Sequence, residues 1–193
     1  MVSIKASVLA AMLFIPAMSP GMAQIPAKEQ TATSYSMDAH TFTFALPKEY
    51  KLAGEKSPSA ESKIFSFSTE PRADGTSGLI MIVLFDQRKL AGQSLSLDQF
   101  VTQMVASVSR KHTDWKSTEG SLELIGVKAR RVEWSGTFER VPNEKYRMRG
   151  VMILGIKDDV GFWLQVRCTE SQALQNLLQG ENALKTFVLK VKR

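Results

Sequence analysis

The sequence has a single cysteine, Cys168, and only two histidines, His40 and His112. One cysteine cannot close a disulfide within the chain, so packing alone has to stabilise the fold. The apolar strand around Cys168 predicts a small buried hydrophobe rather than a reactive thiol. A catalytic histidine needs a nucleophile within hydrogen-bond reach and a third group that orients it, and the spacing supports neither. We therefore expect both histidines to be solvated.

The motifs of common hydrolases, zinc proteases and nucleotide-binding proteins are also missing. The chain contains no Gly-x-Ser-x-Gly, no His-Glu-x-x-His and no phosphate loop. The acids of Asp158–Asp159 and Asp74–Gly75 are better explained as turn residues than as calcium ligands. The sequence thus predicts a protein that is not an enzyme, with no catalytic residue, no metal site and no cofactor.

Long apolar runs are absent apart from one near the start. Met1–Lys5 is short and basic, Ala6–Met18 is apolar, and Gly21–Met22–Ala23 places small residues where a signal peptidase reads them. The apolar run is shorter than the roughly 20 residues that span a bilayer. Residues 1–23 are therefore predicted to be a signal peptide that is cleaved after Ala23. The mature chain is expected to be periplasmic or secreted, without a transmembrane segment.

The rest of the chain divides into a lead-in and one domain. Residues 24–39 are mostly polar and lack periodicity, which predicts a flexible N-terminal lead-in. Residues 40–193 are long enough for a single domain with its own core. The net charge of +6 permits an acidic partner without requiring nucleic acid, which we do not expect to bind.

Strand patterns dominate the domain. Alternating or continuous apolar residues predict strands at 40–46, 63–69, 79–85, 115–125, 126–138, 145–157 and 161–169. The last three are joined by turn residues and should form an antiparallel meander. Residues 53–61, with a glycine, a proline and several charges, are expected to form a loop. The strand at 79–85 is apolar throughout, which is typical of a strand covered on both faces.

Two helices are predicted from capping and periodicity. Ser96 and Gln99 can form a capping box before an apolar face of helical spacing, and Thr169 with Gln172 can do so for a second helix. Gly180 weakens the middle of the second helix and could kink it. The order of elements predicts an α+β fold, an α-β-α sandwich with a mostly antiparallel sheet of six or seven strands and a helix on each face.

This order of elements resembles the PsbP-like family, named for an extrinsic protein of photosystem II. The likeness is carried by Phe-Thr-Phe-Ala-Leu-Pro-Lys-Glu-Tyr at 42–50, by Ser-Leu-Asp-Gln-Phe-Val at 96–101, and by Gly-Phe-Trp-Leu at 161–164 with Thr186–Phe187. These short apolar motifs cover about residues 40 to 190 and describe a scaffold. The resemblance implies an α-β-α sandwich, shared with a Ran-binding import factor, and a binding or assembly role.

A row of cations is the main candidate site. Lys145, Arg147 and Arg149 alternate along one predicted strand and so project from one face. In a tight hairpin Trp134 would lie across from this row. A basic stripe beside an aromatic ring can bind an acidic protein or another anionic surface. The alternative is an exposed sheet face whose charges give solubility.

Two functional hypotheses follow from these observations. The first is a non-catalytic exported binding or assembly factor that uses the basic row. The second is a protein that binds a small apolar or lipidic ligand in a cleft between the sheet and a helix, for which an apolar pocket would be the sign. The sequence names neither the partner nor the oligomeric state.

Overall fold

The computed structural model describes residues 31–37, 40–73, 76–89, 94–141 and 144–191. The strands are β1 (Thr31–Met37), β2 (His40–Leu46), β3 (Lys51–Ser59), β4 (Ser62–Ser68), β5 (Leu79–Asp86), β6 (Thr113–Leu124), β7 (Val127–Val141), β8 (Glu144–Lys157), β9 (Val160–Thr169) and β10 (Val188–Lys190). The helices are α1 (Leu97–Ser109) and α2 (Ala173–Lys185), with short 3-10 turns η1 (Gln87–Lys89) and η2 (Glu170–Gln172).

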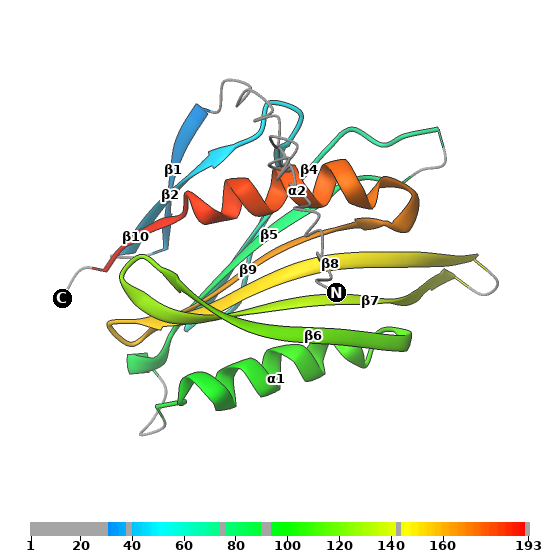
Figure 1. The fold of residues 1–193 in the computed structure, drawn as a ribbon. Helices are drawn as coiled ribbons and strands as arrows, with labels where there is room; N and C mark the ends of the chain where they lie inside the picture. Colours follow the sequence, from blue (N-terminus) through cyan, green and yellow to red (C-terminus); the bar gives the residue numbers. More distant parts are fainter. Residues whose placement is uncertain (1–30, 38–39, 74–75, 90–93, 142–143, 192–193) are drawn as a thin grey trace, which may run out of the picture.

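The strands form two sheets in which neighbours pair antiparallel. A seven-stranded sheet has the order β3-β4-β5-β9-β8-β7-β6, and a three-stranded sheet has the order β1-β2-β10 (Figure 1). The expected meander is confirmed, because β7 pairs with β8 and β8 with β9. The α+β class with a mostly antiparallel sheet is also confirmed. The strand at 40–46 differs from expectation, since it lies in the small sheet.

Three strands occur where none was predicted, and the shortest of them, β10, pairs with β2. β1 lies inside the expected flexible lead-in and pairs along its length with β2, where the ring of Tyr35 stacks on Phe42 at 5.2 Å. β3 occupies most of the expected loop at 53–61 as an edge strand, with almost every side chain exposed. Such an edge strand needs no apolar alternation, so its sequence carries no strand pattern. Residues 24–30 and the predicted signal peptide lie outside the described residues.

The first predicted helix cap is confirmed, whereas the second is not. The Ser96 hydroxyl accepts from the Gln99 amide, and the Gln99 side chain accepts from the Ser96 amide, which closes the capping box of α1. At the second helix the Thr169 side chain makes no cap hydrogen bond. Its hydroxyl instead lies 3.2 Å from that of Ser171, and the turn η2 leads into α2.

Gly180 does not kink α2, which is continuous from Ala173 to Lys185. The glycine lies where the helix approaches β9 most closely. A Cβ atom built on Gly180 would collide with Cγ2 of Val166. The absence of a side chain therefore lets the helix settle on the sheet, which outweighs the local loss of helix propensity.

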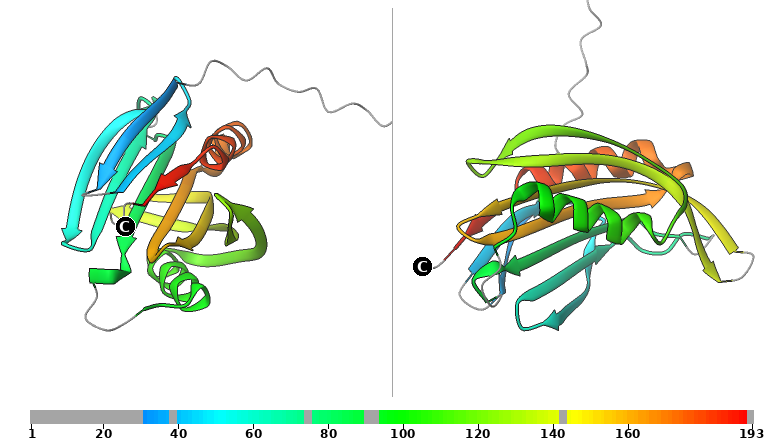
Figure 2. Two further views of the ribbon diagram at one scale, coloured as in Figure 1. Left: turned by 90° about the vertical axis from the view of Figure 1, so that its left-hand side faces the viewer. Right: turned by 90° about the horizontal axis from the view of Figure 1, so that it is seen from below.

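The buried side chains form two clusters, one on each face of the seven-stranded sheet. Alternate residues of a strand point to opposite faces, so Met152 and Leu154 belong to one cluster while Val151 and Ile153 belong to the other. α1 packs into the first cluster through Phe100, Val101 and Val108. The second cluster contains Ala183 and Leu184 of α2 and the phenylalanines of the small sheet, which lies beside this helix (Figure 2).

Cys168 and His40 are both buried. The exposed fraction of Cys168 is 0%, as expected, and burial raises the pKa of its thiol to about 11.

The expectation of a solvated His40 is wrong, because its Nε2 lies 3.0 Å from Oδ2 of Asp86 and only 1% of the residue is exposed. Arg88 donates to the same carboxylate and holds the Asp86 pKa well below its usual range. His40 and Asp86 are 46 residues apart in the sequence, so a local sequence pattern does not predict their contact.

Candidate functional site

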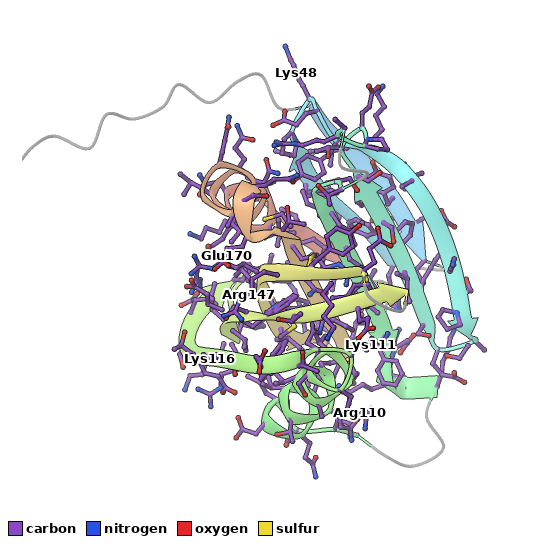
Figure 3. All side chains as sticks on the ribbon, turned by 90° about the vertical axis from the view of Figure 1, so that its right-hand side faces the viewer. Lys48, Arg110, Lys111, Lys116, Arg147 and Glu170 are labelled. Carbon is purple, nitrogen blue, oxygen red and sulfur yellow. The ribbon has the colours of Figure 1, made fainter. Side chains whose placement is uncertain are left out.

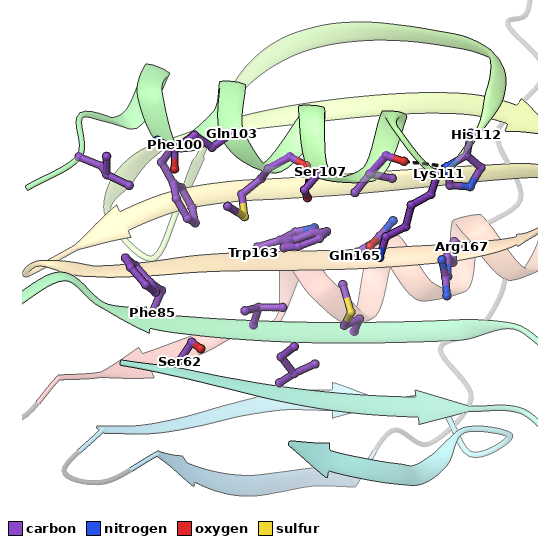
Figure 4. Close-up of a pocket in the computed structure, with 16 residues that line it drawn as sticks. Ser62, Phe85, Phe100, Gln103, Ser107, Lys111, His112, Trp163, Gln165 and Arg167 are labelled. Carbon is purple, nitrogen blue, oxygen red and sulfur yellow. Dashed lines mark hydrogen bonds between the residues drawn. The ribbon is translucent and has the colours of Figure 1, made fainter. Parts of the chain in front are cut away.

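A cleft of about 450 Å³ opens between α1 and the side of the sheet formed by β4, β5 and β9 (Figure 4). α1 packs mainly over β7 and β8, so it leaves this side partly uncovered. On β5 the residues Ile80, Ile82 and Leu84 are fully buried, while Met81 and Val83 are half-buried and face the cleft. The apolar strand predicted to be covered on both faces is therefore covered on one face and forms the cleft floor with the other.

Most of the cleft wall is apolar. The apolar lining residues are Ile64, Met81, Val83, Phe85, Leu95, Phe100, Met104, Val108 and Trp163. The polar lining residues are Ser62, Gln103, Ser107, Lys111, His112, Gln165 and Arg167. The volume lies in the range of about 300–1,000 Å³ that is usual for small-molecule sites, and a mostly apolar wall with a few polar groups is also typical of them.

The cleft changes from apolar to cationic along its length. Trp163, Gln165 and Arg167 alternate on β9 and therefore point into the cleft in that order. α1 runs in the same direction, from Phe100 at one end of the cleft toward the other end, where Lys111 lies two residues past the last residue of the helix. In Figure 4 Phe100 lies at one end of the cleft, and Lys111, Gln165 and Arg167 gather at the other.

Several polar atoms of residues that line the cleft are buried without a partner among the described residues. They are Nε2 of Gln165, Nε1 of Trp163 and Nε2 of His112. The exposed fraction of Gln165 is only 2%. A buried polar group that makes no hydrogen bond costs about 1–3 kcal/mol, so such groups are rare in folded proteins and tend to mark a missing partner.

His112 closes the cationic end and is 9% exposed, so the expectation of a solvated histidine is wrong here too. Its ring lies edge-on to Trp134 at 4.8 Å, and Nδ1 lies 2.8 Å from the carbonyl oxygen of Val108. That carbonyl can only accept, so the hydrogen of the neutral ring is on Nδ1 and Nε2 is an acceptor. Burial is the main cause that lowers the His112 pKa, and the nearby charges of Arg167 and Lys111 lower it further.

Two cations, Arg167 and Lys111, line the cleft. Arg167 is half-buried, and this burial alone lowers the pKa of its guanidinium. Lys111 is exposed at the mouth. Among the residues that line the cleft in the described part of the chain, none is an aspartate or glutamate.

The predicted basic row is present on β8, and acids of the protein lie beside it. Arg147 lies 3.6 Å from Glu170 (Figure 3), and Arg149 lies 3.6 Å from Glu133. Lys145 is exposed and stands across from Glu139 in the register of β7 and β8. Two of the three cations are therefore ion-paired with acids of the protein itself.

Trp134 does not accompany the row. It stands opposite Gly150 in the register, one residue out of phase with Arg149, so it points to the other face of the sheet. There it is 2% exposed and stacks on Trp115 at 4.9 Å. A Cβ on Gly150 would lie 2.6 Å from Cε2 of the Trp134 ring, so the indole occupies the space above this glycine.

A cleft between the sheet and a helix is one of the two functional hypotheses from the sequence, which does not identify the residues of the cleft. The alternation of Trp163, Gln165 and Arg167 was visible in the sequence as a strand pattern with polar residues on one face. What was not visible is that α1 lies to one side and leaves this face open. Within the described ranges, no group of three or more histidine, cysteine or acidic side chains is placed to hold a metal ion.

Sequence comparison finds no match to a family model and none to a curated protein. Solved structures do match in fold. LpqN of Mycobacterium tuberculosis, described as involved in cell envelope biogenesis, has 11% identity and a TM-score of 0.53, over 85% of this chain and 93% of that protein. The cyanobacterial PsbP of Synechocystis has 12% identity and a TM-score of 0.52, over 91% and 99%.

The Ran-binding protein Mog1p of Saccharomyces cerevisiae also matches, with 12% identity and a TM-score of 0.50 over 82% of this chain and 95% of that one. Neither helix in the described part of this chain is long and apolar enough to cross a membrane. At these identities the likeness concerns the fold, and the chain has the fold shared by PsbP and Mog1p.

Proposed function

We propose that this chain is a non-catalytic exported binding protein that holds a small apolar or lipidic ligand in the cleft beside α1. The observation that carries the proposal is the cleft itself, which has the volume and the apolar wall of a ligand site. We also infer that α1, the long sheet and α2 are the layers of an α-β-α sandwich. The cleft then lies between the first two layers, where an offset helix leaves room.

The absence of catalytic activity and the export are parts of the same proposal. The residues that line the cleft include no serine or cysteine beside His112 that would act as a nucleophile: Ser107 uses its hydroxyl to donate to the Met104 carbonyl at 2.7 Å. Among the structural relatives, one is described as Ran-binding and another as involved in cell envelope biogenesis. The signal-peptide pattern of residues 1–23 supports a periplasmic or secreted location.

A role of the basic row in binding an acidic partner takes second place. Its two arginines already contact Glu133 and Glu170, which reduces the charge they present. Exposed ion pairs of this kind contribute little stability, about 0–1 kcal/mol, so a partner can displace them at small cost. The row therefore stays a candidate surface for assembly with an acidic protein or an anionic surface.

To test the cleft as a binding site, a bulky side chain is introduced into it from α1. Ser107→Trp places a large ring in the cleft, and Thr102→Trp places the same ring on an exposed position of α1 that does not line it. N-phenyl-naphthylamine is a neutral apolar dye that fluoresces when it leaves water. We expect dye binding to the wild type and to Thr102→Trp and a loss of at least tenfold in affinity for Ser107→Trp.

Thermal unfolding first establishes that both variants fold. If the wild type does not bind the dye or any apolar chain, or if both tryptophan variants bind as the wild type does, the cleft is not a ligand site and the proposal is wrong.

A further inference from the structure

The cationic end of the cleft is built as a place for negative charge. Arg167 is half-buried on β9, between the register positions of Leu79 on β5 and Gly150 on β8. No ion pair or hydrogen bond of its guanidinium with another described residue is found. A guanidinium that loses water and gains no acid is unfavourable, so an outside anion is the partner that would stabilise it.

A second and independent observation lies beside it. The Gln165 side chain is 98% buried, and its Nε2 has no partner among the described residues. An amide NH₂ can only donate. Figure 4 shows Gln165 next to Lys111 and Arg167 at the same end of the cleft. Three donor groups from β9 and from the end of α1 thus gather where the lining contains no acid.

The opposite end has the contrary character. Beyond Trp163 the lining residues are mostly apolar and include Phe85, Leu95 and Phe100, and the polar residues at this end, Ser62 and Gln103, carry no charge. Trp163 and Arg167 are four residues apart on one strand, which corresponds to roughly 13 Å. The cleft therefore offers a cationic head position and an apolar tail position along one line.

We infer that the ligand is an anionic amphiphile with a single hydrocarbon chain, whose carboxylate or phosphate lies against Arg167, Gln165 and Lys111 and whose chain runs toward Phe100. A guanidinium fork matches either kind of oxyanion in two parallel hydrogen bonds, and Lys111 adds a point charge at the mouth. This inference rests on the proposed function, because it assigns the head group of the ligand that the cleft would hold.

The experiment compares three ligands with the same chain: decanoate, decyl phosphate and decanol. We expect calorimetric titration of the wild type to give affinities at least tenfold higher for an anion than for decanol. Added salt should weaken anion binding and leave decanol binding unchanged. Whichever of decanoate and decyl phosphate binds with the higher affinity indicates whether the head group of the ligand is a carboxylate or a phosphate.

Variants locate the charge. Arg167→Met and Lys111→Met should each reduce anion binding while decanol binding is kept. The matched control is Arg130→Met, which removes an arginine that pairs with Asp98 at 3.0 Å and does not line the cleft. It should bind all three ligands as the wild type does.

Failure of this inference and failure of the proposed function give different results. Equal affinity of the wild type for the anions and decanol, or an anion preference that survives removal of both Arg167 and Lys111, overturns the inference and leaves an apolar cleft. No binding of any of the three ligands overturns both. The comparison of anion and decanol affinities uses the wild type alone, so it tests the inference even if Arg167→Met does not fold.

Discussion

Arg131 on β7 and Glu181 on α2 form a two-pronged ion pair, in which Nε and Nη2 of the arginine donate to the two carboxylate oxygens at 2.8 and 2.9 Å. The Glu181 side chain is 13% exposed, so the pair is partly shielded from water. Glu133 and Lys185 add further charge contacts. The pair fixes the orientation of α2 on the sheet, because both of its members come from regular elements.

The first prediction concerns this pair and pH. The Arg131 guanidinium is the main cause that holds the Glu181 pKa below its ordinary value of 4.5. A carboxyl whose folded pKa is depressed stabilises the protein above its unfolded pKa, and the stabilisation disappears as pH falls through the folded value. Glu181→Gln should therefore lower the free energy of unfolding by about 1–3 kcal/mol near neutral pH. Urea unfolding at a series of pH values measures the difference between the two proteins, which should shrink below about pH 4.5. A difference independent of pH would contradict this account.

A methyl group at Gly180 should destabilise the protein. Alanine improves helix propensity by about 1 kcal/mol, but its Cβ collides with Val166, and overpacking of a core typically costs about 1–3 kcal/mol. We expect a net loss for Gly180→Ala in urea unfolding and a partial recovery when Val166→Ala is added. The control is Gly120→Ala, since no atom lies within 4 Å of a Cβ built there. A stabilised Gly180→Ala would mean that the helix can move away freely.

Cys168 should be inert in the folded protein. Its side chain is fully buried, and burial raises the thiol pKa to about 11, so only about one molecule in a thousand carries the thiolate at pH 8. Alkylation by iodoacetamide, followed by mass spectrometry, should be slow in buffer and rapid in concentrated urea. Rapid alkylation of the native protein would show that the strand end opens or that the thiol is accessible.

The basic row can be tested by releasing its arginines. Glu133→Gln with Glu170→Gln removes the acids that lie 3.6 Å from Arg149 and Arg147. If the row contacts anionic surfaces, this variant should bind vesicles that contain phosphatidylglycerol more tightly than the wild type does. Arg147→Glu with Arg149→Glu should bind more weakly, and salt should reduce all binding because exposed charges are screened over about 8–10 Å. Equal sedimentation of the three proteins with these vesicles would leave the row as a solvated face.

The sequence predicted those elements whose residues are read locally. The capping box of Ser96 and Gln99 and the apolar strands of the meander have patterns that span a few residues, and they occur as expected. β1 and β3 lack such a pattern, because an edge strand can form from polar residues through backbone pairing alone.

The site was harder to predict than the fold. The cleft depends on where α1 lies over the sheet, which is a tertiary property, and the burial of His40 depends on Asp86, 46 residues away. The expected pairing of Trp134 with the basic row failed by one residue of register. A shift of one position in a strand moves a side chain to the other face.

The contact between Trp134 and Gly150 constrains how this sequence can vary. The indole fills the space in which any side chain at position 150 would stand, so position 150 cannot gain a side chain while Trp134 is kept. A relative that carries alanine or a larger residue at 150 needs a smaller residue at 134, although the two are far apart in the sequence. Substitutions at the two positions should therefore be coupled, because a side chain at 150 is tolerated only after the ring at 134 has been lost.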